Sequence, residues 1–133
     1  TRSYYAYVMR NEEKGTRFFR FDLPSVHDGE IDPVLGVRRV VLMPEDIRAS
    51  FDLPFFRFIQ GWIIEGGILY STEGFSNSEQ NPPAIRTVDL AKGSEVYYHL
   101  PSLGINEEPE MIDFMDGVCY YSDAYGNLYT VTF

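Results

Sequence analysis

Three side chains could together form a binding or catalytic site: Gln60, Trp62 and Glu110. A glutamate works as a general acid or base when burial raises its pKa. A glutamine amide donates and accepts hydrogen bonds, and an indole ring offers a flat apolar surface. Such a group would suit a small polar molecule or a carbohydrate. In the alternative interpretation, Gln60 and Glu110 hydrogen-bond neighbouring backbone and have a structural role.

An acidic run around Glu110 offers the oxygen ligands that Ca²⁺ prefers. Its members are Glu107, Glu108, Glu110 and Asp113. The run lacks EF-hand spacing and His27 and His99 lack the spacing of a zinc site, so no metal site is predicted. His99 is expected to be a packed or edge residue of a strand, and Cys119 a buried structural thiol in an apolar stretch. The sequence identifies neither catalytic residues nor a cofactor.

The composition is that of a folded, strand-rich chain. Aromatic residues make up 16% of the 133 residues, and their rings favour strands. Eleven Gly and eight Pro suit turns and would interrupt long helices. The formal net charge is −9, whereas nucleic-acid binding needs a basic surface, so nucleic acid is not an expected partner. No apolar run reaches the ~18 residues that a membrane span needs.

Short apolar and alternating runs, separated by turn residues, predict antiparallel strands in three units at about residues 3–50, 55–101 and 108–133. The first unit is expected to hold strands at 4–9, 16–21 and 37–43, followed by a helical turn at 44–48. The second is expected to hold four strands, at 56–64, 68–71, 84–90 and 95–100. The third is expected to hold strands at 110–114, 118–122 and 128–133, with Asp116-Gly117 as a type I′ hairpin turn.

Similar segments recur along the chain. Phe19–Pro24 resembles Arg86–Leu90, and Ile68–Ser71 resembles Val118–Ser122, which begins 50 residues later. Another pair of matched elements lies 43 residues apart, and the spacing of the first unit is longer, near 65, because of the loop at 24–36. Spacings of 43 to 50 residues are typical of the blades of a β-propeller; the alternative is a sandwich of unrelated hairpins. Three blades cannot close a ring of roughly four to eight. The sequence therefore predicts a single all-β segment of about three blades, a fragment of a larger propeller whose remaining blades come from the same protein or a second copy. The alternative is a stable sub-piece of a propeller with blunted strand edges.

Four segments carry a resemblance to known families: Phe58–Gly61, Gly67–Tyr70, Ile85–Leu90 and Glu108–Glu110. They resemble six-bladed propellers of secreted bacterial proteins, and they are similar to helveticin-type and teichoic-acid-related surface propellers. The resemblance implies a secreted, periplasmic or cell-envelope protein. It also implies a ligand-binding or scaffold module.

The same segments look like glutaminyl cyclases, propeller enzymes with Phe-x-Gln-Gly-Leu followed by Leu-Tyr-x-Ser-Thr-Gly. This resemblance implies an alternative function, a glutaminyl-cyclase-like acyltransferase or a lactonase-like hydrolase that uses Glu110 with Gln60. The chain departs from the cyclases in several places. Trp62 stands where they have Leu, residues 71–74 read Ser-Thr-Glu-Gly, and Pro109-Glu110-Met111 replaces the Gly-Glu-Gly setting of their catalytic Glu. The binding or scaffold module is therefore the preferred prediction.

Overall fold

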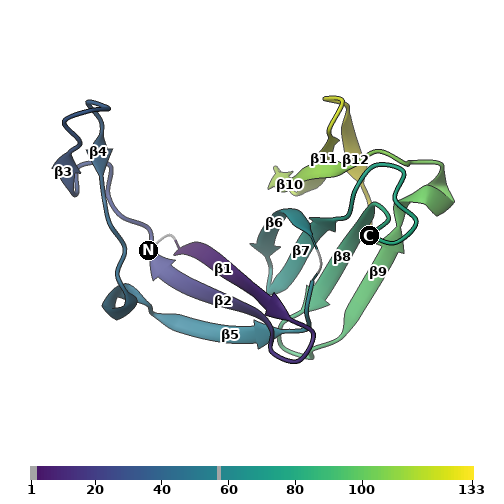
Figure 1. Ribbon diagram of the computed structural model, residues 1–133, viewed down its shortest axis with the longest axis horizontal. Coiled ribbons are helices and arrows are strands. Elements are labelled where there is room, and N and C mark those ends of the chain that lie inside the picture. Colours follow the sequence, from purple (N-terminus) through teal and green to yellow (C-terminus); the bar gives the residue numbers. More distant parts are fainter. Residues whose placement is uncertain (1–2, 57) are drawn as a thin grey trace. The chain divides into compact units, whose positions relative to one another are not determined.

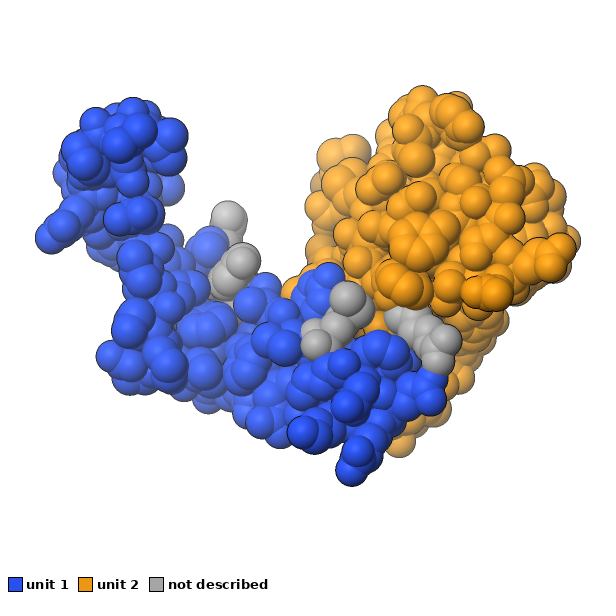
Figure 2. Space-filling model, viewed as in Figure 1, with its two compact units in different colours: residues 1–55 blue, residues 56–133 orange. Residues whose placement is uncertain are grey.

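A computed structural model describes residues 3–56 and 58–133. It divides into two compact units, unit 1 with residues 1–55 and unit 2 with residues 56–133, coloured blue and orange in Figure 2. The predicted all-β fold is confirmed. The helical elements of the described residues are short 3₁₀ turns, η1 (Pro44–Asp46) and η2 (Leu100–Leu103), and the remaining elements are strands.

Unit 1 contains a three-stranded antiparallel sheet in the order β1-β2-β5, visible in Figure 1. Its strands are β1 (Ser3–Asn11), β2 (Gly15–Asp22) and β5 (Ala49–Leu53). The buried ring of Phe18 stacks on Phe51, with centroids 5.3 Å apart, and lies 5.8 Å from Tyr7. On the opposite face, Arg17 donates two hydrogen bonds of 2.8 Å to the Asp52 carboxylate. These cross-strand pairs fix the register of β5 against β2.

The prediction of a strand over residues 37–43 is wrong for most of that segment. Only β4 (Arg38–Arg39) forms there, and it pairs with β3 (Glu30–Ile31) in a two-stranded hairpin. The third strand of the sheet is β5, which the sequence does not predict. Residues 37–43 have the stronger strand propensity, but β5 supplies partners for Phe18 and Arg17 across β2. Side-chain pairing therefore outweighs propensity.

Unit 2 begins with a four-stranded antiparallel sheet in the order β6-β7-β8-β9. The strands are β6 (Ile59–Glu65), β7 (Ile68–Glu73), β8 (Ala84–Asp89) and β9 (Glu95–His99). The four strands predicted for the second unit are therefore confirmed. Along β7, side chains alternate between the two faces, with Leu69, Ser71 and Glu73 on one face and Tyr70 and Thr72 on the other.

A three-stranded antiparallel sheet in the order β10-β11-β12 completes unit 2. The strands are β10 (Pro109–Met115), β11 (Val118–Asp123) and β12 (Leu128–Val131). Asp116 and Gly117 connect β10 to β11. Their φ angles of 52° and 79° are both positive, as the predicted type I′ turn requires.

The core of unit 2 lies between its two sheets. Its buried members are Ile85, Leu100, Ile112, Cys119 and Tyr121. Beside them, the rings of Tyr70 and Phe114 meet with centroids 4.8 Å apart. Gly61 on β6 lets the backbones approach, because a Cβ there would lie 2.7 Å from the Glu110 carbonyl oxygen and 2.8 Å from Met111 Cα. The close stacking of β6 on β10 therefore requires glycine at this position.

The two sheets of unit 2 repeat the same local features. A β-bulge occurs at Gln60 in β6, and another occurs at Glu110 in β10. Equivalent backbone hydrogen bonds accompany the bulges: Gly74 N to Phe58 O at 3.2 Å, and Ala124 N to Glu108 O at 2.8 Å. Phe58 and Gly74, which form the first of these hydrogen bonds, each lie 50 residues before Glu108 and Ala124, which form the second. The similar sequence segments at 68–71 and 118–122 have the same spacing.

The long connection after β2 is an insertion relative to unit 2. The similarity of Phe19–Pro24 to Arg86–Leu90 aligns β2 with β8. Residues 90–94 connect β8 to β9, whereas residues 23–48 connect β2 to β5 and carry β3, β4 and η1. We call residues 23–48 the arm. Figure 1 shows it leaving the sheet of unit 1 at the end of β2 and returning to it at β5.

The turn between β11 and β12 is organised by Asp123, which is 3% exposed. Its carboxylate accepts the backbone amides of Tyr125 and Asn127, both at 3.0 Å. It also accepts the Asn127 side-chain amide at 2.8 Å and the Tyr129 hydroxyl at 3.0 Å. The side-chain hydrogen bond from Asn127 is the largest cause that lowers the pKa of Asp123 below its ordinary value. The folded state therefore favours the ionised carboxylate.

The Asp123→Asn variant is expected to be less stable than the wild type at pH 7. Because the folded-state pKa lies below the unfolded value of about 3.9, the stabilisation from the carboxylate is complete above that value. It disappears as the pH falls through the folded-state pKa. Urea midpoints measured from pH 7 to about pH 2.5 should therefore converge at the acid end. Asp116→Asn, at an exposed turn, serves as the control. A wild-type advantage that stays constant across this range would contradict the account.

Candidate functional site

The structure places the three predicted site residues at different depths on two strands. Gln60 and Trp62 are half-buried on β6, whereas Glu110 is exposed on β10. The Gln60 amide donates to the Gly74 carbonyl at 3.3 Å and to the carboxylate of Glu108. Among the described residues, the acidic partner of Gln60 is thus Glu108 rather than Glu110. A chemical role for Glu110 stays a prediction.

Glu108 links three segments at one end of unit 2. Its carboxylate accepts the hydrogen bond from Gln60 at the start of β6, and its amide donates to Ser76 Oγ at 2.8 Å in the β7–β8 loop. Close by in the chain, the Asn77 amide donates to the Asn106 carbonyl at 2.9 Å. These contacts hold the β7–β8 loop against the segment that leads into β10. They favour the structural interpretation of Gln60.

A pocket of about 410 Å³ lies at this same end of the four-stranded sheet. The β7–β8 loop follows the end of β7, and the segment leading to β10 follows the end of β9. Antiparallel pairing brings both to one end of the sheet. The residues lining the pocket are Asn77, Ser78, Glu79, Pro82, Pro83, His99, Pro101 and Asn106.

The pocket combines prolines with exposed polar side chains. Pro82, Pro83 and Pro101 are half-buried or buried and give it a rigid apolar part. The exposed side chains of the lining form no hydrogen bond or ion pair with any described residue: Asn77, Glu79, His99 and Asn106. Carboxamides and a neutral imidazole both donate and accept hydrogen bonds. The arrangement can therefore bind hydroxyl or carbonyl groups while the prolines contact C–H surface.

The backbone of Asn77 adds a further sign of a built site. Its φ of 54° lies in the left-handed region, which asparagine tolerates better than most residues. Conformations of this kind concentrate at binding and active sites, where the surrounding structure holds them. Here the hydrogen bond from the Asn77 amide to Asn106 holds the backbone in place.

The sequence predicts the loop at 74–83 but not the pocket. The convergence of Asn77, His99 and Asn106 depends on the register of β7, β8 and β9, which the sequence does not specify. The only local signal is the concentration of Asn, Ser and Pro in residues 77–83, and these residue types are typical of any turn. The expectation that His99 is an edge residue of a strand agrees with its position at the end of β9.

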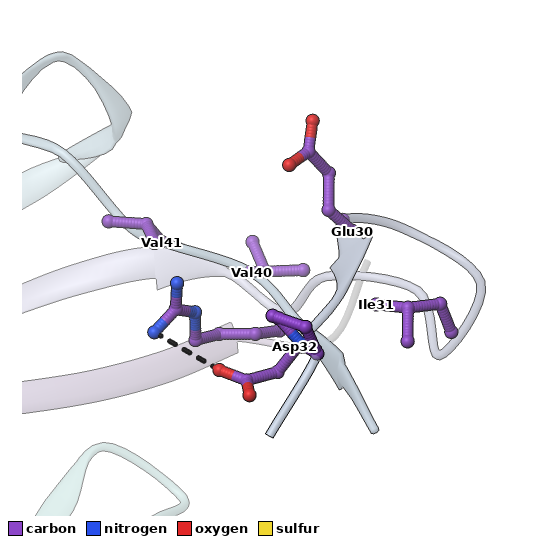
Figure 3. Close-up of a pocket in the computed structure, with 8 residues that line it drawn as sticks. Glu30, Ile31, Asp32, Val40 and Val41 are labelled. Carbon is purple, nitrogen blue, oxygen red and sulfur yellow. Dashed lines mark ion pairs between the residues drawn. The ribbon is translucent and has the colours of Figure 1, made fainter. Parts of the chain in front are cut away.

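A second hollow, of about 360 Å³, lies on the arm of unit 1 and is shown in Figure 3. The Asp32 carboxylate pairs with Arg39 at 3.4 Å and accepts the amides of Val34 and Leu35 at 2.9 and 3.0 Å. One carboxylate thus orders the tip of the arm. The side chains of Val34 and Leu35 are 87% and 69% exposed. The arm presents apolar side chains on an ordered turn.

The four-stranded sheet carries a buried ion pair on the face opposite the core. Arg86 donates to both oxygens of Glu73, at 2.7 and 3.1 Å, and the Ser71 hydroxyl donates to the same carboxylate at 3.1 Å. The guanidinium lies over the rings of Phe56 and Tyr97, 4.7 and 5.3 Å from their centroids. Burial is the largest single influence and lowers the pKa of Arg86, but the hydrogen bonds and charges of Glu73 and Glu95, the latter 3.2 Å away, together outweigh it, so this pKa is raised. The charges and hydrogen-bonding groups of these residues are paired with one another, which indicates a structural role.

The remaining candidate features are metal ligands, the thiol of Cys119 and membrane-spanning segments, each considered in the described part of the chain. No group of three His, Cys, Asp or Glu side chains there could hold a metal ion. Cys119 is 2% exposed, and burial is the largest cause that raises the pKa of its thiol, as expected of a structural cysteine. None of the helical segments in the described residues has the length and apolar character needed to cross a membrane.

Comparison of the chain with known protein families, with curated proteins and with solved structures finds no match.

Proposed function

We propose that the chain is a propeller-type binding module, and that the pocket beside His99 and Asn106 takes a polar small molecule such as a carbohydrate. The observation that carries this proposal is the set of polar side chains around the pocket that have no partner among the described residues. In a folded protein such groups are either solvated or used by a ligand. Their placement on two loops at one end of a rigid sheet is typical of binding sites.

Two observations support the propeller type. One is the four-stranded meander stacked on a second meander, with bulges and hydrogen bonds repeated 50 residues apart. The other is the connectivity, in which the last strand of one sheet leads directly to the first strand of the next. Repeats of this kind bury their faces by stacking on neighbours. The remaining blades would come from the same protein or from a second copy.

The charge of the chain narrows the class of ligand. The formal net charge is −9, and the pocket itself contains Glu79 with no cationic lysine or arginine in its lining. An anionic ligand would be repelled by this field. A neutral polyhydroxyl compound would meet the amides of Asn77 and Asn106 and the imidazole of His99 without that cost. A neutral sugar is therefore the favoured ligand.

Titration of the full chain with the methyl glycosides of glucose, galactose, mannose and N-acetylglucosamine tests this function. At least one glycoside is expected to give saturable NMR shifts of the side-chain amides of Asn77 and Asn106. His99→Ala and Asn106→Ala should each weaken that binding about tenfold, since each removes a polar contact to the ligand. His27→Ala, another exposed histidine, should leave binding unchanged.

Two results would overturn the proposal. One is the lack of saturable shifts with all four glycosides. The other is equal binding by the wild type and His99→Ala, which would place the ligand elsewhere.

A further inference from the structure

The strand β12 is an edge strand, although its counterpart in the four-stranded sheet is an inner strand. Residues 128–131 (Leu-Tyr-Thr-Val) resemble residues 85–88 (Ile-Arg-Thr-Val) of β8, 43 residues earlier. The registers agree, because Val131 lies opposite Cys119 on β11 as Val88 lies opposite Leu69 on β7. β8 pairs on both sides, whereas β12 pairs with β11 alone among the described strands. In the described part of the chain, the third sheet therefore has no counterpart of β9.

The open edge of β12 presents backbone hydrogen-bonding groups. At the start of the β11–β12 pair, the Asp123 amide donates to the Asn127 carbonyl at 3.1 Å. Hydrogen-bonded and non-hydrogen-bonded pairs alternate along an antiparallel ladder, so Leu128 and Thr130 direct their amides and carbonyls away from β11. The residues at the same positions of β8 pair with β9. An edge of this kind is a template for the addition of another strand.

An apolar cavity of about 230 Å³ lies at this edge of the third sheet. The third sheet and the residues after it line the cavity with Tyr121 of β11 and with residues 129–133. The rest of the lining comes from β8, β9, η2 and the residue after η2, namely Ile85, Tyr98, Leu100, Leu103 and Ile105. Leu103 and Phe133 are 71% and 47% exposed, so the cavity opens to solvent. The space beside β12 is therefore apolar and accessible.

We propose that an extended segment of another polypeptide adds to the open edge of β12 as a fourth antiparallel strand and places apolar side chains in this cavity. Hydrogen bonds to the backbone of Leu128 and Thr130 supply affinity, and the cavity selects side chains at alternate positions. The selected side chains lie opposite Tyr129 and Val131, because these two residues pack against the core between the sheets.

The partner is a different polypeptide rather than a second copy. Every described strand already pairs with another strand, so a second copy could donate one only by losing that pairing. The cavity also shares no lining residue with the pocket beside His99. Strand addition at β12 is thus independent of carbohydrate binding and goes beyond it.

A peptide based on residues 93–100, which include β9, tests this inference with the full chain. Its sequence is acetyl-Gly-Ser-Leu-Val-Tyr-Tyr-His-Leu-amide, with Leu in place of Glu95. In the register of β8 with β9, this Leu and the first Tyr of the peptide lie opposite Val131 and Tyr129. The matched control peptide carries Thr at both positions, which keeps strand propensity and charge but removes the apolar groups.

NMR titration of the wild type with the first peptide is expected to give saturable shifts of the Leu128 and Thr130 backbone amides. The Thr-containing peptide should bind at least about tenfold more weakly, because it fills the cavity with less apolar surface.

Thr130→Pro removes one amide from the open edge. That amide points away from β11, and proline is tolerated where the N–H of an edge strand faces solvent. The variant is expected to lose peptide binding while its urea midpoint stays close to that of the wild type. Glu95→Pro, on the edge strand β9, is the control and should bind the peptide as the wild type does.

The inference is overturned if the wild type does not bind the first peptide, if it binds both peptides equally, or if Thr130→Pro binds as the wild type does. If Thr130→Pro fails to fold, the comparison of the two peptides decides alone. A dimer of the free chain in which the Leu128 and Thr130 amides are protected from exchange would make a second copy the occupant, and would also overturn it.

Discussion

Replacing Gly61 with alanine is expected to destabilise unit 2 by about 3 kcal/mol, the upper end of the usual cost of overpacking. The added Cβ would lie 2.7 Å from the Glu110 carbonyl oxygen and 2.8 Å from Met111 Cα. Both are backbone atoms and cannot move aside as a flexible side chain would. β6 and β10 would have to separate, which would open the core between the two sheets.

Urea unfolding followed by the fluorescence of Trp62 measures this effect, because Trp62 is the only tryptophan of the chain and lies on β6. Gly104→Ala is the control. Its Cβ would meet open space, so only the positive φ of 79° should cost stability, about 1 kcal/mol. Equal losses for the two variants would show that β6 and β10 are not in close contact.

Replacing Arg86 with methionine is expected to cost about 3–5 kcal/mol, because it leaves a buried carboxylate without its cation. Glu73 is 4% exposed, and Arg86 supplies both of its charged hydrogen bonds. The double variant Glu73→Leu/Arg86→Met should recover much of the loss, since a buried ion pair is often no more stable than apolar residues of similar size.

The same urea measurement checks this prediction, and Arg17→Met provides the matched control. Arg17 makes a comparable two-bond pair with Asp52, but that carboxylate is 46% exposed. Its loss should therefore cost far less stability than the loss of Arg86, because solvent screens an exposed pair. A small effect of Arg86→Met, or a double variant as unstable as the single one, would contradict the account of the buried pair.

The strands of unit 2 could be predicted from the sequence because several local signals agree there. Asp116-Gly117 dictates a type I′ turn, and β-prone runs of the right length flank it. The 50-residue spacing of Ile68–Ser71 and Val118–Ser122 equals the spacing of the two bulges, at Gln60 and Glu110, although the bulges themselves were not predicted. Local propensity and long-range pairing favour the same strands in these segments, so these strands could be predicted from the sequence alone.

In unit 1, local strand propensity and long-range strand pairing favour different segments. The valine-rich run at 37–43 has the stronger propensity, yet β5 pairs with β2 through Phe51 and Asp52. The grouping of Gln60, Trp62 and Glu110 around a ligand stays a prediction, and the structure adds a hydrogen bond from Gln60 to Glu108 that the sequence did not predict. The bulge at Glu110 leaves that side chain exposed, while Glu108 lies within reach. Register and bulges arise from pairing across the sheet, which a single sequence does not encode locally.

The stacking of one meander on the next underlies the account of unit 2 and of its core. Nuclear Overhauser contacts between the ring protons of Tyr70 and Phe114 test it most directly. The account predicts strong contacts, because the ring centroids lie 4.8 Å apart across the two sheets. Absence of these contacts, together with hydrogen-bonded backbone pairing of β6 with β10 in one continuous sheet, would contradict it.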